Sequence, residues 1–304
     1  MEAIATDEAG LSVTGGAHRG LRMAVDLSSK PIRSHKVESS NSSILRQTLL
    51  RVPEVTLVFW IIKTLSTTVG ETGADFLAVD LGWGMPLTTL LMVSVMGLLL
   101  YLQFGRLKHY VPANYWTLVV MMSVVGTLIT DMLVDMAGVS LLALSGVFAV
   151  MMLAGFFLWY REEGTLSIHS IDTGRREAWY WVVILLAFAL GTGVGDLISE
   201  HFALGYDRAL LLFSGLIATV AVAHYAFKLN AVTAFWIAYV LTRPLGASLG
   251  DFMIQAPGDG GLGIDMLGVN VAFLAAIVTL VGYELIRIRQ AALMPAALRK
   301  YDEA

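Results

Sequence analysis

Four polar side chains stand at intervals of four residues within one apolar stretch of this sequence. They are Lys63, Thr67, Glu71 and Asp75. Residues four apart lie on one face of a helix, so these side chains form a single polar stripe that turns slowly around the helix axis. An ionised side chain in a membrane-spanning helix costs about 2.5 to 3.5 kcal/mol, so such groups normally face a water-filled cavity or one another. The stripe predicts a polar site enclosed by helices.

The stretch that carries this stripe occurs four times, and the copies align without a gap. Each copy has an aromatic residue followed by Trp, a Gly ten residues after the Trp, and an Asp five residues after the Gly. The Trp residues are Trp60, Trp116, Trp181 and Trp236. The Gly residues are Gly70, Gly126, Gly191 and Gly246. The Asp residues are Asp75, Asp131, Asp196 and Asp251. At C-terminal helix ends the helix dipole disfavours an anion, so we interpret the Asp residues as a functional set rather than as helix boundaries.

The other positions of the stripe differ between the copies. At the position of Glu71 the later copies have Thr127, Thr192 and Ala247. At the position of Thr67 they have Ser123, Phe188 and Arg243. Lys63 and Arg243 therefore stand against an excess of carboxylates. We consider three roles for them: counterions that keep an empty site near neutral, ligands of an anionic substrate, or structural partners of Glu71 and Asp251.

The composition excludes most soluble proteins. The chain has 304 residues, of which 57% are hydrophobic and only 14% are charged, and its mean hydropathy is +0.71. Soluble domains carry about a quarter charged residues, so we expect an all-helical integral membrane protein and no nucleic-acid partner. The chain has no Cys, which excludes thiol chemistry. Since it also has no recognisable catalytic motif, we predict that it is not an enzyme and has no cofactor.

Apolar blocks predict eight membrane helices with short connections. Their expected ranges are 53–77, 85–105, 112–133, 139–160, 178–199, 207–228, 231–253 and 267–288. We divide the chain into a disordered tail, two membrane halves of two repeats each and a second tail, at residues 1–50, 53–160, 178–288 and 289–304. Because each repeat holds two helices, the four motif helices run parallel, and their Asp residues share one depth near the outer leaflet.

Positive charge predicts the orientation. All but three of the 20 Lys and Arg residues lie in the two tails or in the loops on the same side of the membrane as the tails; the exceptions are Lys63, Arg208 and Arg243. Positive residues near helix ends are retained in the cytoplasm. We therefore expect a multi-pass protein of a bacterial inner membrane with both termini cytoplasmic. The four repeat Trp residues then lie near the cytoplasmic side, where we interpret them as interfacial anchors.

The repeated W, G and D pattern resembles a family of bacterial multi-pass membrane proteins that is described only as uncharacterised. The resemblance covers about 53–287 and is most specific in TRPLGASLGD, from Thr242 to Asp251. It implies a fold and no function. A weaker resemblance is to cation exchangers with a Glu-x-Gly-Asp signature on repeated helices, which Gly70-Glu71, Gly195-Asp196 and Gly250-Asp251 meet only in part.

These features favour a transporter of a small cation, with proton exchange as a possible driving reaction. The predicted ligands of the ion or of exchanged protons are Glu71, Asp75, Asp131, Asp196 and Asp251. The predicted neutral oxygen ligands are Thr67, Thr127 and Thr192. Oxygen ligands without Cys suit a divalent ion such as Mn, Ca or Mg, and Mn is the first choice.

Two alternatives stay open. The first is a carrier of a small anion that Lys63 and Arg243 hold, and the second is a membrane scaffold or sensor that transports nothing. The sequence predicts the lipid bilayer and a small ion as partners, and it leaves the oligomeric state open.

Overall fold

A computed structural model of the chain describes residues 50–293, and the described part is helical without any strand. The predicted tails, apart from Leu50 and residues 289–293, lie outside the described residues. The long helices are α2 (Leu57–Asp75), α3 (Met85–Leu102), α4 (Pro112–Asp131), α5 (Leu141–Glu163), α6 (Gly174–Asp196), α7 (Tyr206–Tyr225), α8 (Ala231–Ile254) and α9 (Met266–Leu293). Eight long helices and no strand within this range confirm that the fold is all-helical, as predicted. Helix α9 continues to Leu293, into the range that we assigned to the C-terminal tail.

Short helical turns follow several of these helices. Three π-helical turns begin directly after a repeat Asp, at Phe76–Asp80, Met132–Met136 and Leu197–His201. A fourth, Gln103–Leu107, follows α3. Single 3₁₀ turns lie at Ile168–Ser170 and Pro257–Asp259. Widened π turns often occur at functional sites. In three of the four repeats, such a turn begins directly after the Asp of the motif.

Seven of the long helices have the length and composition to cross a membrane. They are α3 to α9, some of them together with the π turn that follows. Helix α2 does not meet the same criterion, because it carries Lys63, Glu71 and Asp75. Large apolar side chains such as Leu90, Val150 and Leu211 are exposed on α3, α5 and α7. Apolar residues on the outside and charged residues on a buried helix indicate a membrane protein.

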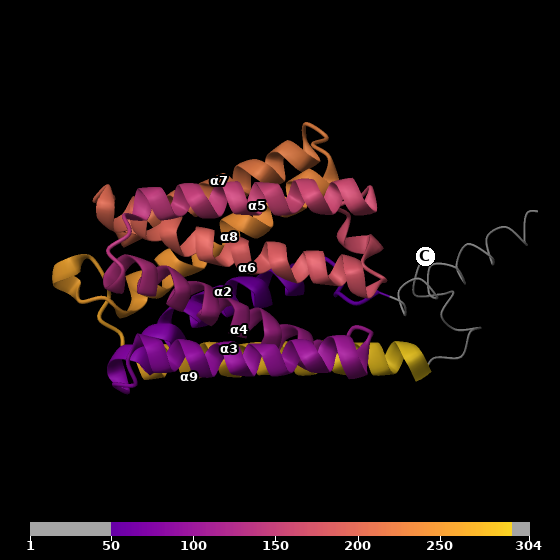
Figure 1. Cartoon of the computed structure of the whole chain (residues 1–304), viewed down its shortest axis with the longest axis horizontal. Coiled ribbons are helices and arrows are strands. Elements are labelled where there is room, and N and C mark those ends of the chain that lie inside the picture. Colours follow the sequence, from indigo (N-terminus) through magenta and orange to yellow (C-terminus); the bar gives the residue numbers. More distant parts are fainter. Residues whose placement is uncertain (1–49, 294–304) are drawn as a thin grey trace, which may run out of the picture. The chain divides into compact units, whose positions relative to one another are not determined.

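The four helices that carry the motif form a closed ring. Helix α2 packs on α4, α4 on α6, α6 on α8, and α8 on α2. Each outer helix packs on the next inner helix, with α3 on α4, α5 on α6, α7 on α8, and α9 on α2. Figure 1 shows α5 and α7 along one side of the bundle and α3 and α9 along the other, with the inner helices between them. The four tandem repeats therefore occupy equivalent places around one central axis.

The repeat glycines bring the inner helices into close contact. A Cβ added at each of them would overlap the next helix of the ring at one equivalent position. The added Cβ would lie 1.9 Å from Ser123 Oγ at Gly70, 2.9 Å from Phe188 Cβ at Gly126, 2.4 Å from Arg243 Cγ at Gly191, and 2.2 Å from Thr67 Oγ1 at Gly246. A methyl group at any of these positions would force the helices apart, which is why each copy has Gly there.

The aromatic pairs at the start of each copy close one end of the ring. The first aromatic ring of each copy lies against the Trp of the next copy. The centroid distances are 5.5 Å for Phe59 and Trp116, 5.3 Å for Tyr115 and Trp181, 6.0 Å for Tyr180 and Trp236, and 5.7 Å for Phe235 and Trp60. We call these eight residues the aromatic girdle. The end of the ring that holds it is the aromatic end, and the opposite end, with the four repeat Asp residues, is the aspartate end.

The prediction that the repeat Trp residues are interfacial anchors is wrong. Trp116, Trp181 and Trp236 are only 1%, 3% and 6% exposed, and Trp60 is half-buried. Their indole rings fill the space between neighbouring inner helices, where they bury more apolar area than at a lipid interface. The position of a Trp near a helix end in the sequence did not show whether it lies at the lipid interface or between helices.

The segment before α2 is held at the aromatic end. The Arg51 amide donates to the Ile171 carbonyl at 3.0 Å, and the Tyr110 amide donates to the Leu50 carbonyl at 3.2 Å. The Arg51 guanidinium pairs with Glu177 at 2.7 Å, and the Glu177 side chain is fully buried. The chain is therefore held in place from Leu50, which is the last residue of the range assigned to the tail.

Candidate functional site

The interior of the ring is built from layers of four side chains, one from each inner helix. Since residues four apart share a helix face, successive positions of the stripe stack along the ring axis. From the aromatic end, the first layer is Lys63, Val119, Ile184 and Tyr239. The second is Thr67, Ser123, Phe188 and Arg243. The third is Glu71, Thr127, Thr192 and Ala247, and the fourth is the four repeat Asp residues. Every member of the first three layers is buried.

Arg243 joins all four inner helices. From α8, its Nη2 atom donates to Glu71 Oε2 of α2 at 2.6 Å and to Thr192 Oγ1 of α6 at 2.6 Å. The same atom donates to Thr127 Oγ1 of α4. Both Arg243 and Glu71 are buried, at 0% and 5% exposure. A charge-assisted network of this kind is strong because it is shielded from water.

Local structure explains how Arg243 reaches this position. Gly191 of α6 has no side chain, and this lets the Arg243 side chain lie against the α6 backbone. Pro244 follows and has no amide hydrogen, so one helix bond of α8 is missing there. On the α2 side, the Thr67 hydroxyl lies 3.1 Å from the Thr242 carbonyl and bonds α2 to α8. Thr67 therefore supports the helix contact beside Arg243.

Three of the five predicted carboxylates come together. Glu71, Asp196 and Asp251 each place a carboxylate oxygen within 4.8 Å of the others. Asp251 is 6% exposed and Asp196 is half-buried. Glu71 binds Arg243 through Oε2, and a carboxylate has a second oxygen that can accept from another partner. Oxygen atoms at this spacing can share one metal ion.

Asp75 and Asp131 lie outside this group of three. Both are half-buried, and both interact electrostatically with Glu71. They therefore add two further carboxyl groups close to the group of three, at the aspartate end of the ring. The four repeat Asp residues are equivalent in the motif, but among the described residues only Asp196 and Asp251 form a group with Glu71 in which all three carboxylates lie within 4.8 Å of one another.

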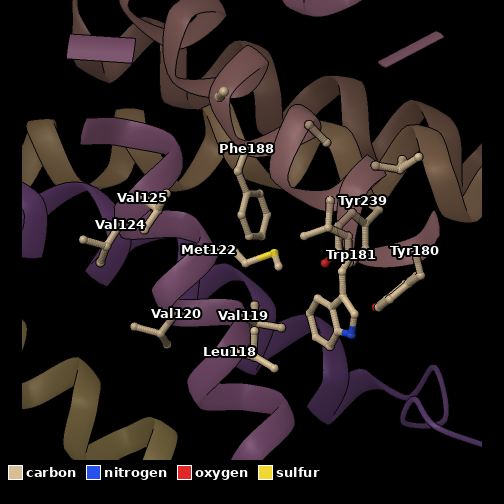
Figure 2. Packing of buried hydrophobic residues seen from close by; sticks show 14 of the residues in the cluster. Leu118, Val119, Val120, Met122, Val124, Val125, Tyr180, Trp181, Phe188 and Tyr239 are labelled. Atoms are coloured by element: carbon tan, nitrogen blue, oxygen red, sulfur yellow. The ribbon is translucent and has the colours of Figure 1, made fainter. Parts of the chain in front are cut away.

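Lys63 contacts aromatic rings, whereas Arg243 contacts polar side chains. Its ammonium lies 4.1 Å from the ring centroid of Phe188 and 4.3 Å from that of Tyr239. The two rings are stacked at 6.3 Å with an interplanar angle of 10°. Figure 2 shows Phe188 and Tyr239 among the buried apolar side chains, with Met122 close to Phe188. Lys63 is thus held by aromatic faces, and the partner of Glu71 is Arg243.

Thr127 and Thr192 lie where the sequence placed them, beside the carboxylates. Both hydroxyls accept from Arg243, and Thr127 Oγ1 lies 3.3 Å from Glu71 Oε2. The hydroxyl of Thr67, by contrast, donates to main-chain carbonyls, including that of Thr64 at 2.8 Å. Of the three predicted neutral ligands, two are in the layer that holds Glu71.

Sequence reasoning missed the polar contacts of α9. Glu284 accepts from the Trp116 indole at 3.0 Å and from the Tyr110 hydroxyl at 2.6 Å, so it holds one member of the aromatic girdle in place. Burial and the charge of Glu284 raise the pKa of the Tyr110 hydroxyl above its usual range. Asn270 bonds Thr72 of α2 at 2.9 Å. The signal was available, because an acid and an amide are unusual in an otherwise apolar membrane helix.

Comparison with known families confirms the repeat. A family model described as a repeat of unknown function (DUF347) matches residues 58–108, 114–165, 179–230 and 234–290. Each match contains one inner helix and the outer helix that follows it. Neither a curated protein nor a solved structure matches the chain. The four matches agree with the predicted helix pairs, and they carry no information on a substrate.

Proposed function

We propose that this chain, which belongs to the DUF347 repeat family, binds a small divalent cation at the centre of its helix ring and moves it across a membrane. The observation that carries the proposal is the group formed by Glu71, Asp196 and Asp251, whose oxygens lie within 4.8 Å of one another across the third and fourth layers of the ring. The cation is the substrate, and the residues of the ring are its ligands.

Electrostatics gives the reason for a cation. Two ionised carboxylates within 4.8 Å repel by at least about 3 kcal/mol when the effective dielectric constant is about 20. Arg243 compensates one of the three negative charges through its bond to Glu71. A charge of about minus two remains when all three groups are ionised, and one divalent cation neutralises it. Without that cation, protons can occupy the same carboxylates, which supports exchange of a cation for protons.

The ligand chemistry favours a hard ion. Asp196, Asp251 and Glu71 offer carboxylate oxygens, and Thr127 and Thr192 add neutral oxygens in the layer of Glu71. All-oxygen sites suit Mg, Ca and Mn better than Cu or Zn. We keep Mn as the first choice among these ions.

The two ends of the ring suggest the route. Half-buried Asp75 and Asp131 lie at the aspartate end and attract cations toward the group of three. The aromatic girdle closes the other end, so passage requires its rings to separate. With both termini in the cytoplasm of a bacterium, the aspartate end faces outward and the girdle is the inner gate.

The anion-carrier alternative requires Arg243 to be free for a substrate. The bond from Arg243 to Glu71 and to two hydroxyls argues against this, because an anion would have to displace three partners. The scaffold alternative makes no use of the carboxylate group. Both alternatives are separated from the proposal by measuring cation binding and flux.

The test uses purified protein and two kinds of variant. Asp251→Asn and Asp196→Asn remove one charge of the group, whereas Asp135→Asn removes an exposed carboxylate at the aspartate end and serves as the matched control. Binding of Mn, Mg and Ca is measured by calorimetry, and uptake is measured in proteoliposomes. We expect the first two variants to lose at least about tenfold in affinity, or about 1.4 kcal/mol, and the control to behave as the wild type. Wild-type affinity and flux in both site variants would refute the proposal.

A further inference from the structure

We infer that the ring holds a second ion site, in which Lys63 and Arg243 bind a small monovalent anion such as chloride on the aromatic side of the carboxylates. The inference does not rest on cation transport. It rests on two buried cationic groups whose donors lack acceptors.

The first unsatisfied donor is the Lys63 ammonium. Lys63 is fully buried, and its Nζ atom has no hydrogen-bond acceptor among the described residues. An ammonium has three N–H donors. The faces of Phe188 and Tyr239 stabilise the charge from two directions, but they leave at least one donor without an acceptor. A buried charge in this state is costly unless a partner of opposite sign is present.

The second unsatisfied donor is Arg243 Nε. Arg243 directs Nη2 to the layer of Glu71, and Nη1 lies 3.5 Å from the Thr67 carbonyl. Its Nε atom is buried and lacks an acceptor within the described part of the chain. Lys63 and Arg243 belong to adjacent layers on α2 and α8, which pack together, and their like charges interact. An anion between them would satisfy both donors and relieve this repulsion.

Charge and space define the class of anion. When Lys63 is protonated, Lys63 and Arg243 carry two positive charges, and Glu71 supplies one negative charge to Arg243. One monovalent anion therefore balances this part of the ring. The inner helices are in close contact around Arg243, since a Cβ at Gly191 would lie 2.4 Å from its Cγ atom. The other members of the two layers that hold Lys63 and Arg243 are buried side chains, so we assign a monatomic anion of the size of chloride rather than an organic one.

The test is chloride binding to the full chain in detergent, in gluconate buffer that contains a metal chelator. Chloride replaces gluconate at constant ionic strength, and sulfate is the comparison anion. We expect radiolabelled chloride to bind the wild type saturably, with one ion per chain, and to raise its Tm. Sulfate should do neither. A wild type without saturable chloride binding would overturn the inference whatever the variants do.

Variants assign the site to Lys63. Lys63→Met should lose at least tenfold in chloride affinity, and its Tm in gluconate should equal or exceed that of the wild type because an unpaired buried charge is gone. Lys228→Met removes an exposed ammonium and should bind as the wild type does. Lys63→Arg keeps the charge and should retain binding in part. Undiminished chloride binding by Lys63→Met would also overturn the inference.

The same measurements separate this site from the cation site. Asp251→Asn should bind chloride as the wild type does, because Asp251 lies three layers away from Lys63 along the stripe. If chloride binds and divalent cations do not, the anion site stands and the proposed function fails. If divalent cations bind and chloride does not, only the anion site fails.

Discussion

Breaking the bond between Arg243 and Glu71 should destabilise the ring more than any surface change. Arg243 Nη2 lies 2.6 Å from Glu71 Oε2, and counted for the side chains alone the exposed fractions of Arg243 and Glu71 are 0% and 7%. Removing one partner of a buried ion pair leaves the other charge uncompensated, at a cost of about 3 to 5 kcal/mol. We therefore expect Arg243→Met and Glu71→Gln each to lower the free energy of unfolding by about that amount.

The double variant provides the decisive comparison. Arg243→Met combined with Glu71→Gln removes both charges, so the uncompensated charge disappears. What remains is the loss of the bonds to Thr127 and Thr192, at about 0.5 to 1.5 kcal/mol each. We expect the double variant to lie about 1 to 3 kcal/mol below the wild type. The effects of the single variants should therefore fail to add by at least about 2 kcal/mol.

The assay is unfolding in mixed micelles by SDS titration, followed by Trp fluorescence. Arg208→Met, at an exposed position on α7, is the matched control and should change the free energy of unfolding by less than about 0.5 kcal/mol. If the two single effects add within about 0.5 kcal/mol, Arg243 and Glu71 are not coupled and the described network is wrong.

Two further predictions concern packing and topology. Gly191→Ala places a Cβ 2.4 Å from Arg243 Cγ and should lower the free energy of unfolding by about 1 to 3 kcal/mol. The control Gly146→Ala meets nothing within 4 Å and should be neutral or stabilising. Equal unfolding curves for the two variants would contradict the close contact at Gly191. A Cys introduced at Ser170 of this Cys-free chain should be protected from an impermeant reagent added outside intact cells, and its labelling there would refute the predicted orientation.

Much of the fold could be predicted because the relevant signals are local. Apolar blocks long enough to cross a bilayer must be helical, since lipid offers no partner to a free backbone group. The repeat was visible because each copy keeps Trp, Gly and Asp at fixed spacing, and the family matches confirm it. The overlap that a Cβ would cause at Gly70 or Gly246 gives the physical reason for a Gly at this fixed position of each copy.

The site was only partly predictable, because a stripe on one helix does not say which helix faces it. The sequence by itself determined the membrane class, the helix pairs and the set of ionisable groups that had to be enclosed. Only the tertiary structure decided that Arg243, not Lys63, pairs with Glu71, that two of the four repeat Asp residues join Glu71, and that the repeat Trp residues lie between helices. Closing four helices into a ring fixes these distances, and that closure depends on contacts between residues that are more than fifty positions apart in the chain.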